Sequence, residues 1–193
     1  MRIVGLVGSP RKGRNTDVIV RRVLDGCRDA GAAAGTVHLN DLQIRPGQAC
    51  RVQDGQGCRF RDGMDGIYEV LQEADGLVLG TPVYYNAVSA QMKLMVDRCQ
   101  CLAMPVPLPD GGVSYQSAVG KKKKGIVVAV GGSGLNPDIV LPTFRIWAPE
   151  VNLELVGSLL ATRAGLGMEP MDNGVLLEQA YRMGRDLVAA MMG

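Results

Sequence analysis

The chain has 193 residues, of which 47% are hydrophobic and 21% are charged, a balance typical of one globular domain. Its formal net charge of +2 is too small to favour nucleic acid or a membrane surface as a partner. Five irregularly spaced cysteines, the lack of a signal peptide and the lack of an 18-residue apolar run predict a cytoplasmic protein without a disulfide framework or a membrane span.

Strand-like and helix-like segments alternate along the chain. The apolar run at 2–8 ends in glycine, as a buried strand does, and residues 16–30 place apolar side chains on one helical face, with Asn15 or Thr16 expected as the N-cap. The same alternation then repeats. We expect strands at 2–8, 36–42, 76–85, 125–132 and 153–161, helices at 16–30, 63–74, 87–101, 137–147 and 173–192, and long connections at 43–62 and 102–119.

Apolar strands that alternate with helices are typical of a parallel sheet covered on both faces. Right-handed crossovers turn such a chain into a doubly wound α/β sheet. We therefore predict one domain over residues 1–193, with five parallel strands in the order 2-1-3-4-5 and helices on both faces. Ligands of such sheets bind beyond the carboxyl ends of the strands. The segments 8–16, 81–90 and 131–136 are expected to meet there.

The stretch VGSPRKGRNT at 7–16 has the composition of an anion-binding loop, because it joins glycines, hydroxyls and cations at the start of a helix. It is not a nucleoside-triphosphate loop, since Arg14 and Asn15 stand where lysine and serine or threonine belong, and it lacks the dinucleotide pattern G-x-G-x-x-G. A single phosphate remains, as on a mononucleotide, with a polar turn as the alternative. The candidate donors are Ser9, Arg11, Lys12, Arg14, Asn15 and Thr16.

A second loop, TPVYYNAVSAQMK, follows the central strand and points to the other end of this mononucleotide. Adjacent tyrosines and exposed backbone amides at a sharp turn suit a flat heteroaromatic ring with polar edges, such as a flavin. The alternative is that Tyr84 and Tyr85 are ordinary amphipathic surface residues.

Together, GSPRKGRNT and ADGLVLGTPVYYNAVSAQMKLMVDR resemble the NADPH-dependent FMN reductase branch of the flavodoxin-like superfamily, and more narrowly the iron-sulfur flavoproteins. The resemblance covers most of residues 2–132. It implies a flavodoxin-like fold, bound FMN and a homodimer or homotetramer. By position, the resemblance implies that the phosphate and ribityl end of FMN is held by Ser9, Arg11, Asn15 and Thr16, assisted by Lys12. It implies that the isoalloxazine ring is lined by Pro82, Val83, Tyr84, Tyr85, Asn86 and Ser89. It also implies that Gly131 and Gly132 approach the edge of the ring.

The loop after the second predicted strand departs from the iron-sulfur flavoproteins, which carry a compact four-cysteine cluster motif there. The matching stretch is PGQACRVQDGQGC, in which Cys50 and Cys58 remain while Gly47 and Gln53 occupy the other two positions. A [4Fe–4S] cluster normally takes four thiolates. We therefore predict no metal site in this loop. The two cysteines either form a redox-active pair beside the flavin or pack as small residues.

The remaining metal-ligating residues give no site either. Cys99 and Cys101 form a C-x-C pair without the histidines or acids that would complete a zinc site, and we expect them at a helix end on the opposite side of the sheet from the cysteine loop. The only histidine, His38, lies in a predicted strand and is interpreted as structural. No side chain is assigned a catalytic role.

These features favour an FMN-dependent oxidoreductase that takes electrons from NAD(P)H and passes them to a small acceptor such as a quinone or a flavin; the flavin carries the chemistry. One alternative is a flavodoxin-like electron carrier, although such carriers are typically acidic and this chain has a pI of about 8.3. The other is a redox-sensing flavin module that works through Cys50 and Cys58 without turnover.

Overall fold

A central parallel sheet organises the molecule, as the computed structural model shows for residues 1–50, 57–132, 134–162 and 169–192. Its strands are β1 (Arg2–Val7), β2 (Ala33–His38), β3 (Gly76–Tyr84), β7 (Lys123–Gly131) and β8 (Leu153–Thr162). They pair in the order β2-β1-β3-β7-β8, every pair parallel. This is the predicted order 2-1-3-4-5, and the predicted doubly wound sheet is confirmed.

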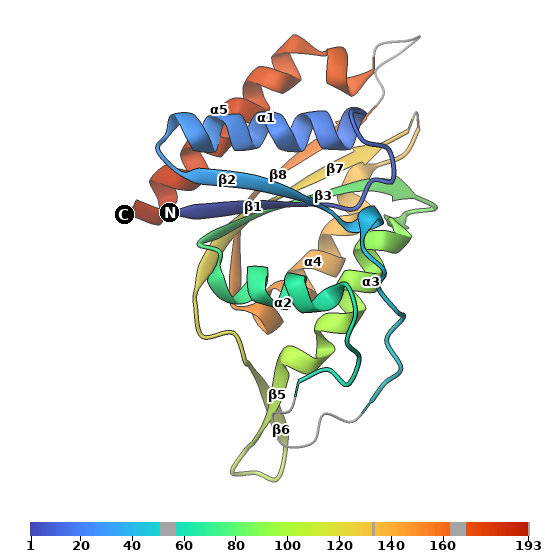
Figure 1. Ribbon diagram of the computed structural model, residues 1–193, viewed down its shortest axis with the longest axis vertical. Helices are drawn as coiled ribbons and strands as arrows, with labels where there is room; N and C mark the ends of the chain where they lie inside the picture. Colours follow the sequence, from blue (N-terminus) through green and yellow to red (C-terminus); the bar gives the residue numbers. More distant parts are fainter. Residues whose placement is uncertain (51–56, 133, 163–168, 193) are drawn as a thin grey trace.

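Helices cover both faces of the sheet (Figure 1). On one face lie α1 (Asn15–Asp29) and α5 (Gly174–Met192), and on the other lie α2 (Met64–Glu73), α3 (Ala90–Arg98) and α4 (Leu141–Trp147). Each face has its own buried core, because the strands alternate between contributing side chains to one layer and to the other: Ile3 and Val7 belong to the α1/α5 side, whereas Val4 and Leu6 belong to the α2/α3/α4 side. None of the described helices is both long and apolar enough to cross a bilayer.

The contact between α1 and α5 depends on two glycines that let the helix backbones approach closely. A Cβ atom at Gly26 would lie 1.9 Å from the carbonyl oxygen of Tyr181, and one at Gly184 would lie 1.9 Å from the carbonyl oxygen of Val23. No side chain fits at either position. Helix α5 therefore packs closely against α1, the helix that follows the predicted anion-binding loop.

The structure differs from the predicted elements in three places. Residues 102–119 are not merely a connection, because β5 (Ala103–Pro107) and β6 (Val113–Ser117) form an antiparallel hairpin. Its prolines favoured a loop, but a two-stranded hairpin has only edge strands, where proline is tolerated. The predicted strand 36–42 is displaced to β2 and is followed by a 3-10 turn, Leu39–Asp41. The other 3-10 turns are Cys99–Leu102, Pro137–Val140, Ala148–Val151 and Pro170–Asp172.

The third difference concerns the turn after β3. Residues Ala87–Val88 form a short strand, β4, that pairs antiparallel with the end of β3, so the following helix α3 begins at Ala90 rather than at 87. Tyr85 and Asn86 make the two-residue turn with φ values of 50° and 59°. Positive φ at both central residues suits a tight hairpin turn. This turn stands directly beside the carboxyl end of the central strand.

Candidate functional site

A cavity of about 370 Å³ opens at the carboxyl ends of β1, β3 and β7, where the topology predicts a ligand. Its first wall comes from the loop after β1 and the first turn of α1. The predicted donors that line it are Ser9, Arg11, Arg14, Asn15 and Thr16. The predicted phosphate loop and the carboxyl end of the sheet thus form one cavity, of a size common for small-ligand sites.

The start of α1 leaves its first backbone amides without a side-chain cap among the described residues. The helix begins at Asn15 with Arg14 at the N-cap position. The prediction that Asn15 or Thr16 caps the helix is therefore wrong. Ser9 and Thr16 are almost fully buried, and the backbone N–H of Arg11 donates to Ser9 Oγ at 3.2 Å. Uncapped amides, hydroxyls and two guanidinium groups together suit a phosphate.

Asp17, which the sequence analysis did not select, fixes the shape of this loop. Its carboxylate is wholly buried, accepts the backbone N–H of Gly13 at 2.7 Å and pairs with Arg21 at 2.9 Å. Gly13 has a φ of +67°, which favours glycine there. His38, at the end of β2, places Nε2 3.4 Å from an Asp17 oxygen. The only histidine therefore packs behind the loop rather than in the cavity.

Glu169 is a second residue of the site that sequence reasoning missed. It lines the cavity, and its carboxylate accepts the side-chain N–H of Asn15 at 2.6 Å. The other end of the Asn15 amide accepts the backbone N–H of Met171 at 3.1 Å. The sequence analysis assigned Asn15 to ligand binding. In this structure its side-chain NH₂ and carbonyl oxygen both bond to the segment before α5, and so connect that segment to the start of α1. No local pattern signals this contact, because 154 residues separate its partners.

The opposite wall of the cavity is mostly backbone and apolar side chains. It comes from the ends of β3 and β7, and the predicted ring-binding residues that line it are Pro82, Val83, Tyr84, Gly131 and Gly132, joined by Val130 and Leu135. The side chain of Tyr84 is partly exposed at 42%. A cavity that joins cations and hydroxyls to apolar side chains and glycine backbone suits a ligand that combines a phosphate with a planar ring.

Four predicted site residues do not line this cavity. Lys12 forms an ion pair with Asp41 at 2.6 Å. Ser89 is fully buried, donates to the carbonyl oxygen of Gly8 at 2.7 Å and caps α3. The remaining two, Tyr85 and Asn86, form the exposed turn between β3 and β4.

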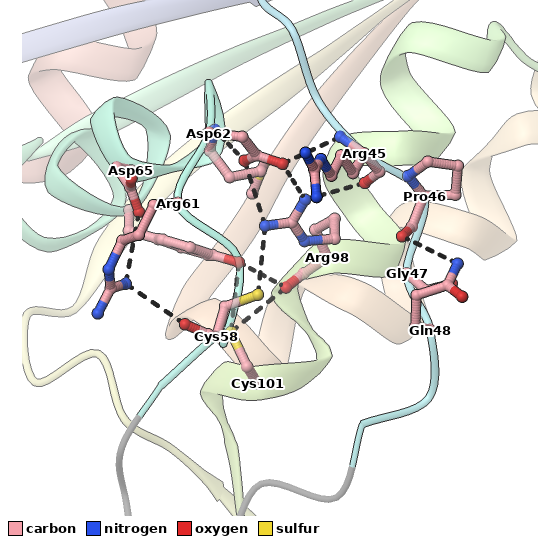
Figure 2. Close-up of polar contacts among 12 residues, drawn as sticks. Arg45, Pro46, Gly47, Gln48, Cys58, Arg61, Asp62, Asp65, Arg98 and Cys101 are labelled. Atoms are coloured by element: carbon pink, nitrogen blue, oxygen red, sulfur yellow. Dashed lines mark hydrogen bonds and ion pairs between the residues drawn. The ribbon is translucent and has the colours of Figure 1, made fainter.

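The cysteines lie elsewhere. Cys50 and Cys58 line a second cavity, which shares no lining residue with the first. The same cavity includes Cys101, so the expectation that the C-x-C pair lies on the opposite side of the sheet is wrong (Figure 2). The reason is that the chain after β2 runs along α3 to its carboxyl end, where Asp62 pairs with Arg98 at 2.6 Å.

Among the residues that the structure describes, no group of three or more histidine, cysteine or acidic side chains is arranged to hold a metal ion. Gln53, which the sequence analysis matched to one of the two missing positions of the cluster motif, lies outside the described residues.

Comparison with known proteins shows the family to which the chain belongs. The profile of the family described as NADPH-dependent FMN reductase matches residues 1–162. The chain belongs to this family. It is 34% identical over 134 residues to an iron-sulfur flavoprotein of Methanocaldococcus jannaschii, an alignment that covers 69% of this chain and 63% of the relative. The chain thus matches less than two thirds of that relative's length.

Two further relatives illustrate the family. A putative NAD(P)H-dependent FMN-containing oxidoreductase of Bacillus subtilis is 30% identical over 139 residues, covering 72% of this chain and 70% of that protein. The solved structure of an NAD(P)H:quinone oxidoreductase from Methanothermobacter marburgensis superposes with a TM-score of 0.73 at 16% identity, covering 97% and 98% of the two chains. The second similarity bears on the fold. Together these findings make the chain a member of a flavin-dependent oxidoreductase family.

Proposed function

We propose that this chain binds FMN in the cavity at the carboxyl ends of β1, β3 and β7, accepts electrons from NAD(P)H and passes them to a small acceptor such as a quinone or a flavin. The observation that carries the proposal is the polarity of this one cavity. Its first wall holds the uncapped start of α1 with Ser9, Arg11 and Thr16, and its second wall is apolar and backbone-rich.

The chain's own residues have the task of binding and orientation. Ser9, Arg11 and Thr16 hold the phosphate with hydroxyl and guanidinium donors, and Lys12 adds positive charge from outside the cavity. Asp17 keeps the Gly13 amide in place, and Asn15 is held by Glu169 so that the loop stays closed. Both acids act on the loop rather than on the ligand.

At the other end, the proposed ring-binding wall is Pro82, Val83 and Tyr84 together with Gly131 and Gly132, which lack side chains that would keep a planar ring at a distance. Tyr85 and Asn86 stand at the mouth of this wall, and Ser89 supports it from beneath. Bound FMN would supply the hydride and electron transfer chemistry. No side chain of the cavity needs to act as an acid or base.

The first experiment is the absorbance spectrum of the purified protein, followed by assays for FMN, iron and acid-labile sulfide. We expect flavin bands and about one FMN per chain, without stoichiometric iron, because the described cysteines do not form a ligand set. About four irons per chain in protein purified without oxygen would contradict this prediction. A protein that neither retains nor binds added FMN would contradict the proposed function itself.

Steady-state turnover then separates the three functional hypotheses. An oxidoreductase consumes NADPH or NADH in the presence of a quinone, free FMN or ferricyanide. An electron carrier or a redox-sensing module binds FMN but does not turn over with the nicotinamide. Turnover with every acceptor at a Cys50→Ser, Cys58→Ser double variant would argue against the sensing alternative.

We also propose a cytoplasmic homodimer or homotetramer. The support is the resemblance to the NADPH-dependent FMN reductases, which implies a homodimer or homotetramer. Light scattering is the test. A particle of 20.5 kDa at micromolar concentration would contradict the proposal.

A further inference from the structure

The second cavity concentrates thiol groups and positive charge. It measures about 460 Å³, lies at the carboxyl end of α3, and is lined by Cys50, Cys58 and Cys101. Three arginines, Arg59, Arg61 and Arg98, line it together with one carboxylate, Asp97, among the described residues. Behind the lining, Arg61 pairs with Asp65 at 3.7 Å and Arg98 pairs with Asp62 at 2.6 Å, so Arg59 supplies the positive charge that no described carboxylate balances. Asp97 already pairs with Lys93 at 2.5 Å. A cavity of this size and charge suits a small anionic ligand.

Cys58 is held directly against a buried guanidinium group. Arg98, whose side chain is 2% exposed, donates from Nη2 to Cys58 Sγ at 3.2 Å and from Nη1 to Asp62 at 2.6 Å (Figure 2). The third donor of this group, Arg98 Nε, is buried without a hydrogen-bond partner among the described residues. Burial raises the pKa of the Cys58 thiol, but the N–H of Phe60 and the Arg98 guanidinium outweigh it, so the net pKa is lowered. Such surroundings favour the reactive thiolate.

Cys101, like Cys58, contacts Arg98. Its sulfur lies 3.3 Å from the Tyr68 hydroxyl and 3.3 Å from the carbonyl oxygen of Arg98. The Tyr68 hydroxyl itself donates to the carbonyl oxygen of Arg98 at 2.9 Å, so Tyr68 and Arg98 hold the two cysteines in one cluster. Burial raises the pKa of the Cys101 thiol, which keeps it protonated. Cys58 lies in irregular backbone before α2, and both sulfurs contact Arg98: Cys58 Sγ contacts the guanidinium group and Cys101 Sγ contacts the backbone carbonyl oxygen.

We propose that Cys58 and Cys101 form a thiol–disulfide exchange site for low-molecular-weight disulfides that carry carboxylates. The Cys58 thiolate attacks one sulfur of the disulfide RSSR, which forms a Cys58–S–SR bond and releases RS⁻. The released thiolate takes the proton of the Cys101 thiol, and the Cys101 thiolate then attacks Cys58 Sγ, which forms the Cys58–Cys101 disulfide and releases the second thiolate. Two protein thiols are oxidised and one disulfide is reduced to two thiols. This inference is independent of the proposed FMN chemistry.

The roles of the two cysteines follow from their surroundings. Cys58 has the guanidinium contact and attacks first, whereas Cys101 has the neutral tyrosine contact and resolves the adduct. Cys50 lines the cavity but has neither contact within the part of the chain that the structure describes, which makes it the natural control. Cys27 and Cys99 are buried in the two cores and are expected to stay unmodified.

The test uses the reduced full chain with its bound cofactor, treated at neutral pH with oxidised glutathione, quenched with acid, alkylated and mapped by mass spectrometry. We expect glutathione first on Cys58, then a Cys58–Cys101 disulfide that dithiothreitol reverses. Cys101→Ser should trap the adduct on Cys58, Cys58→Ser should remove both products, and Cys50→Ser should behave as the parent. A first adduct on Cys50, or a Cys50–Cys58 disulfide, would overturn the proposal.

A second comparison tests the charge preference. The uncharged hydroxyethyl disulfide should react with Cys58 roughly tenfold more slowly than oxidised glutathione, because it lacks carboxylates to meet the arginines. Arg59→Gln should slow the reaction with oxidised glutathione and leave the reaction with hydroxyethyl disulfide unchanged. Equal rates for the two reagents in the parent chain would show that the cavity does not select anionic disulfides.

Discussion

The hydroxyl of Ser89 donates a 2.7 Å hydrogen bond to the carbonyl oxygen of Gly8, which joins the loop after β3 to the loop after β1. Ser89 Oγ also caps α3 by accepting the N–H of Met92 at 3.3 Å. A Cβ atom at Gly8 would lie 2.7 Å from Ser89 Oγ, so the glycine is needed for the bond to form. The two walls of the cavity are thus fastened together beneath the place proposed for FMN.

Replacing Ser89 should therefore loosen the site rather than remove a ligand contact. Ser89→Ala deletes a buried hydrogen bond and an N-cap, and should lower the free energy of unfolding of the apoprotein by about 1–3 kcal/mol. Urea unfolding of the apoprotein measures this. The exposed Ser114→Ala in β6 is the control and should change little. If Ser89→Ala weakens FMN binding while the apoprotein keeps its stability, then Ser89 contacts FMN directly.

Arg11 and Lys12 form a matched pair for the phosphate site, because only Arg11 lines the cavity while Lys12 is engaged with Asp41. Arg11→Ala should weaken FMN binding roughly tenfold to a hundredfold, since one charge-assisted hydrogen bond contributes about 1.5–3 kcal/mol. Lys12→Ala should have a distinctly smaller effect. Fluorescence titration of the apoprotein with FMN gives both values. Unchanged affinity in Arg11→Ala would contradict the assignment of this wall to the phosphate.

Two glycines in different helices should respond to alanine with opposite sign. At Gly26 the new Cβ would meet the backbone of Tyr181 at 1.9 Å, whereas at Gly66 nothing lies within 4 Å. Gly26→Ala should push α1 and α5 apart and cost about 1–3 kcal/mol or more. Gly66→Ala, on the exposed side of α2, should stabilise by about 0.5–1 kcal/mol through helix propensity. Thermal unfolding of both variants measures the difference; a stable Gly26→Ala variant would contradict the described helix packing.

Local patterns were sufficient to predict the sheet and most of the first cavity. Buried strands such as β3 are continuous apolar runs, and strand order then follows from general rules of chain connection. The loop after β1 could be selected as part of the cavity because its polar residues are neighbours in sequence. The hairpin β5–β6 was not predicted because its prolines favour a loop, although an edge strand tolerates proline where no ladder hydrogen bond is needed from its nitrogen.

Contacts between segments far apart in the chain could not be predicted from the sequence. The Glu169 carboxylate meets Asn15 across 154 residues, and the Arg98 guanidinium meets Cys58 across 40. Sequence neighbours of Cys58 such as Arg59 were the natural candidates for its charged partner. The partner that touches its sulfur comes instead from the end of α3, and only the packing of the loop against that helix shows it.

The ion pair of Arg98 with Asp62 makes the stability of the chain depend on pH. The Asp62 side chain is 7% exposed and accepts hydrogen bonds from Arg98 and from the backbone N–H groups of Arg45 and Met64. Burial by itself raises the pKa of this carboxyl, but the guanidinium and the amides outweigh burial and lower the pKa from 3.8 to about 2. The folded state therefore favours the carboxylate form.

Because the folded pKa lies below the unfolded one, the stabilising contribution of Asp62 is fully present above about pH 4 and is lost as the pH falls toward 2. Two pKa units correspond to about 2–3 kcal/mol. Asp62→Asn should lower the free energy of unfolding at pH 7, since it leaves Arg98 buried without its counter-charge, and its difference from the parent should shrink by about 2 kcal/mol between pH 4 and pH 2. Glu69→Gln, on the exposed side of α2, should show no such convergence. Urea unfolding at a series of pH values measures both, and a parent–variant difference that stays constant down to pH 2 would refute the coupling.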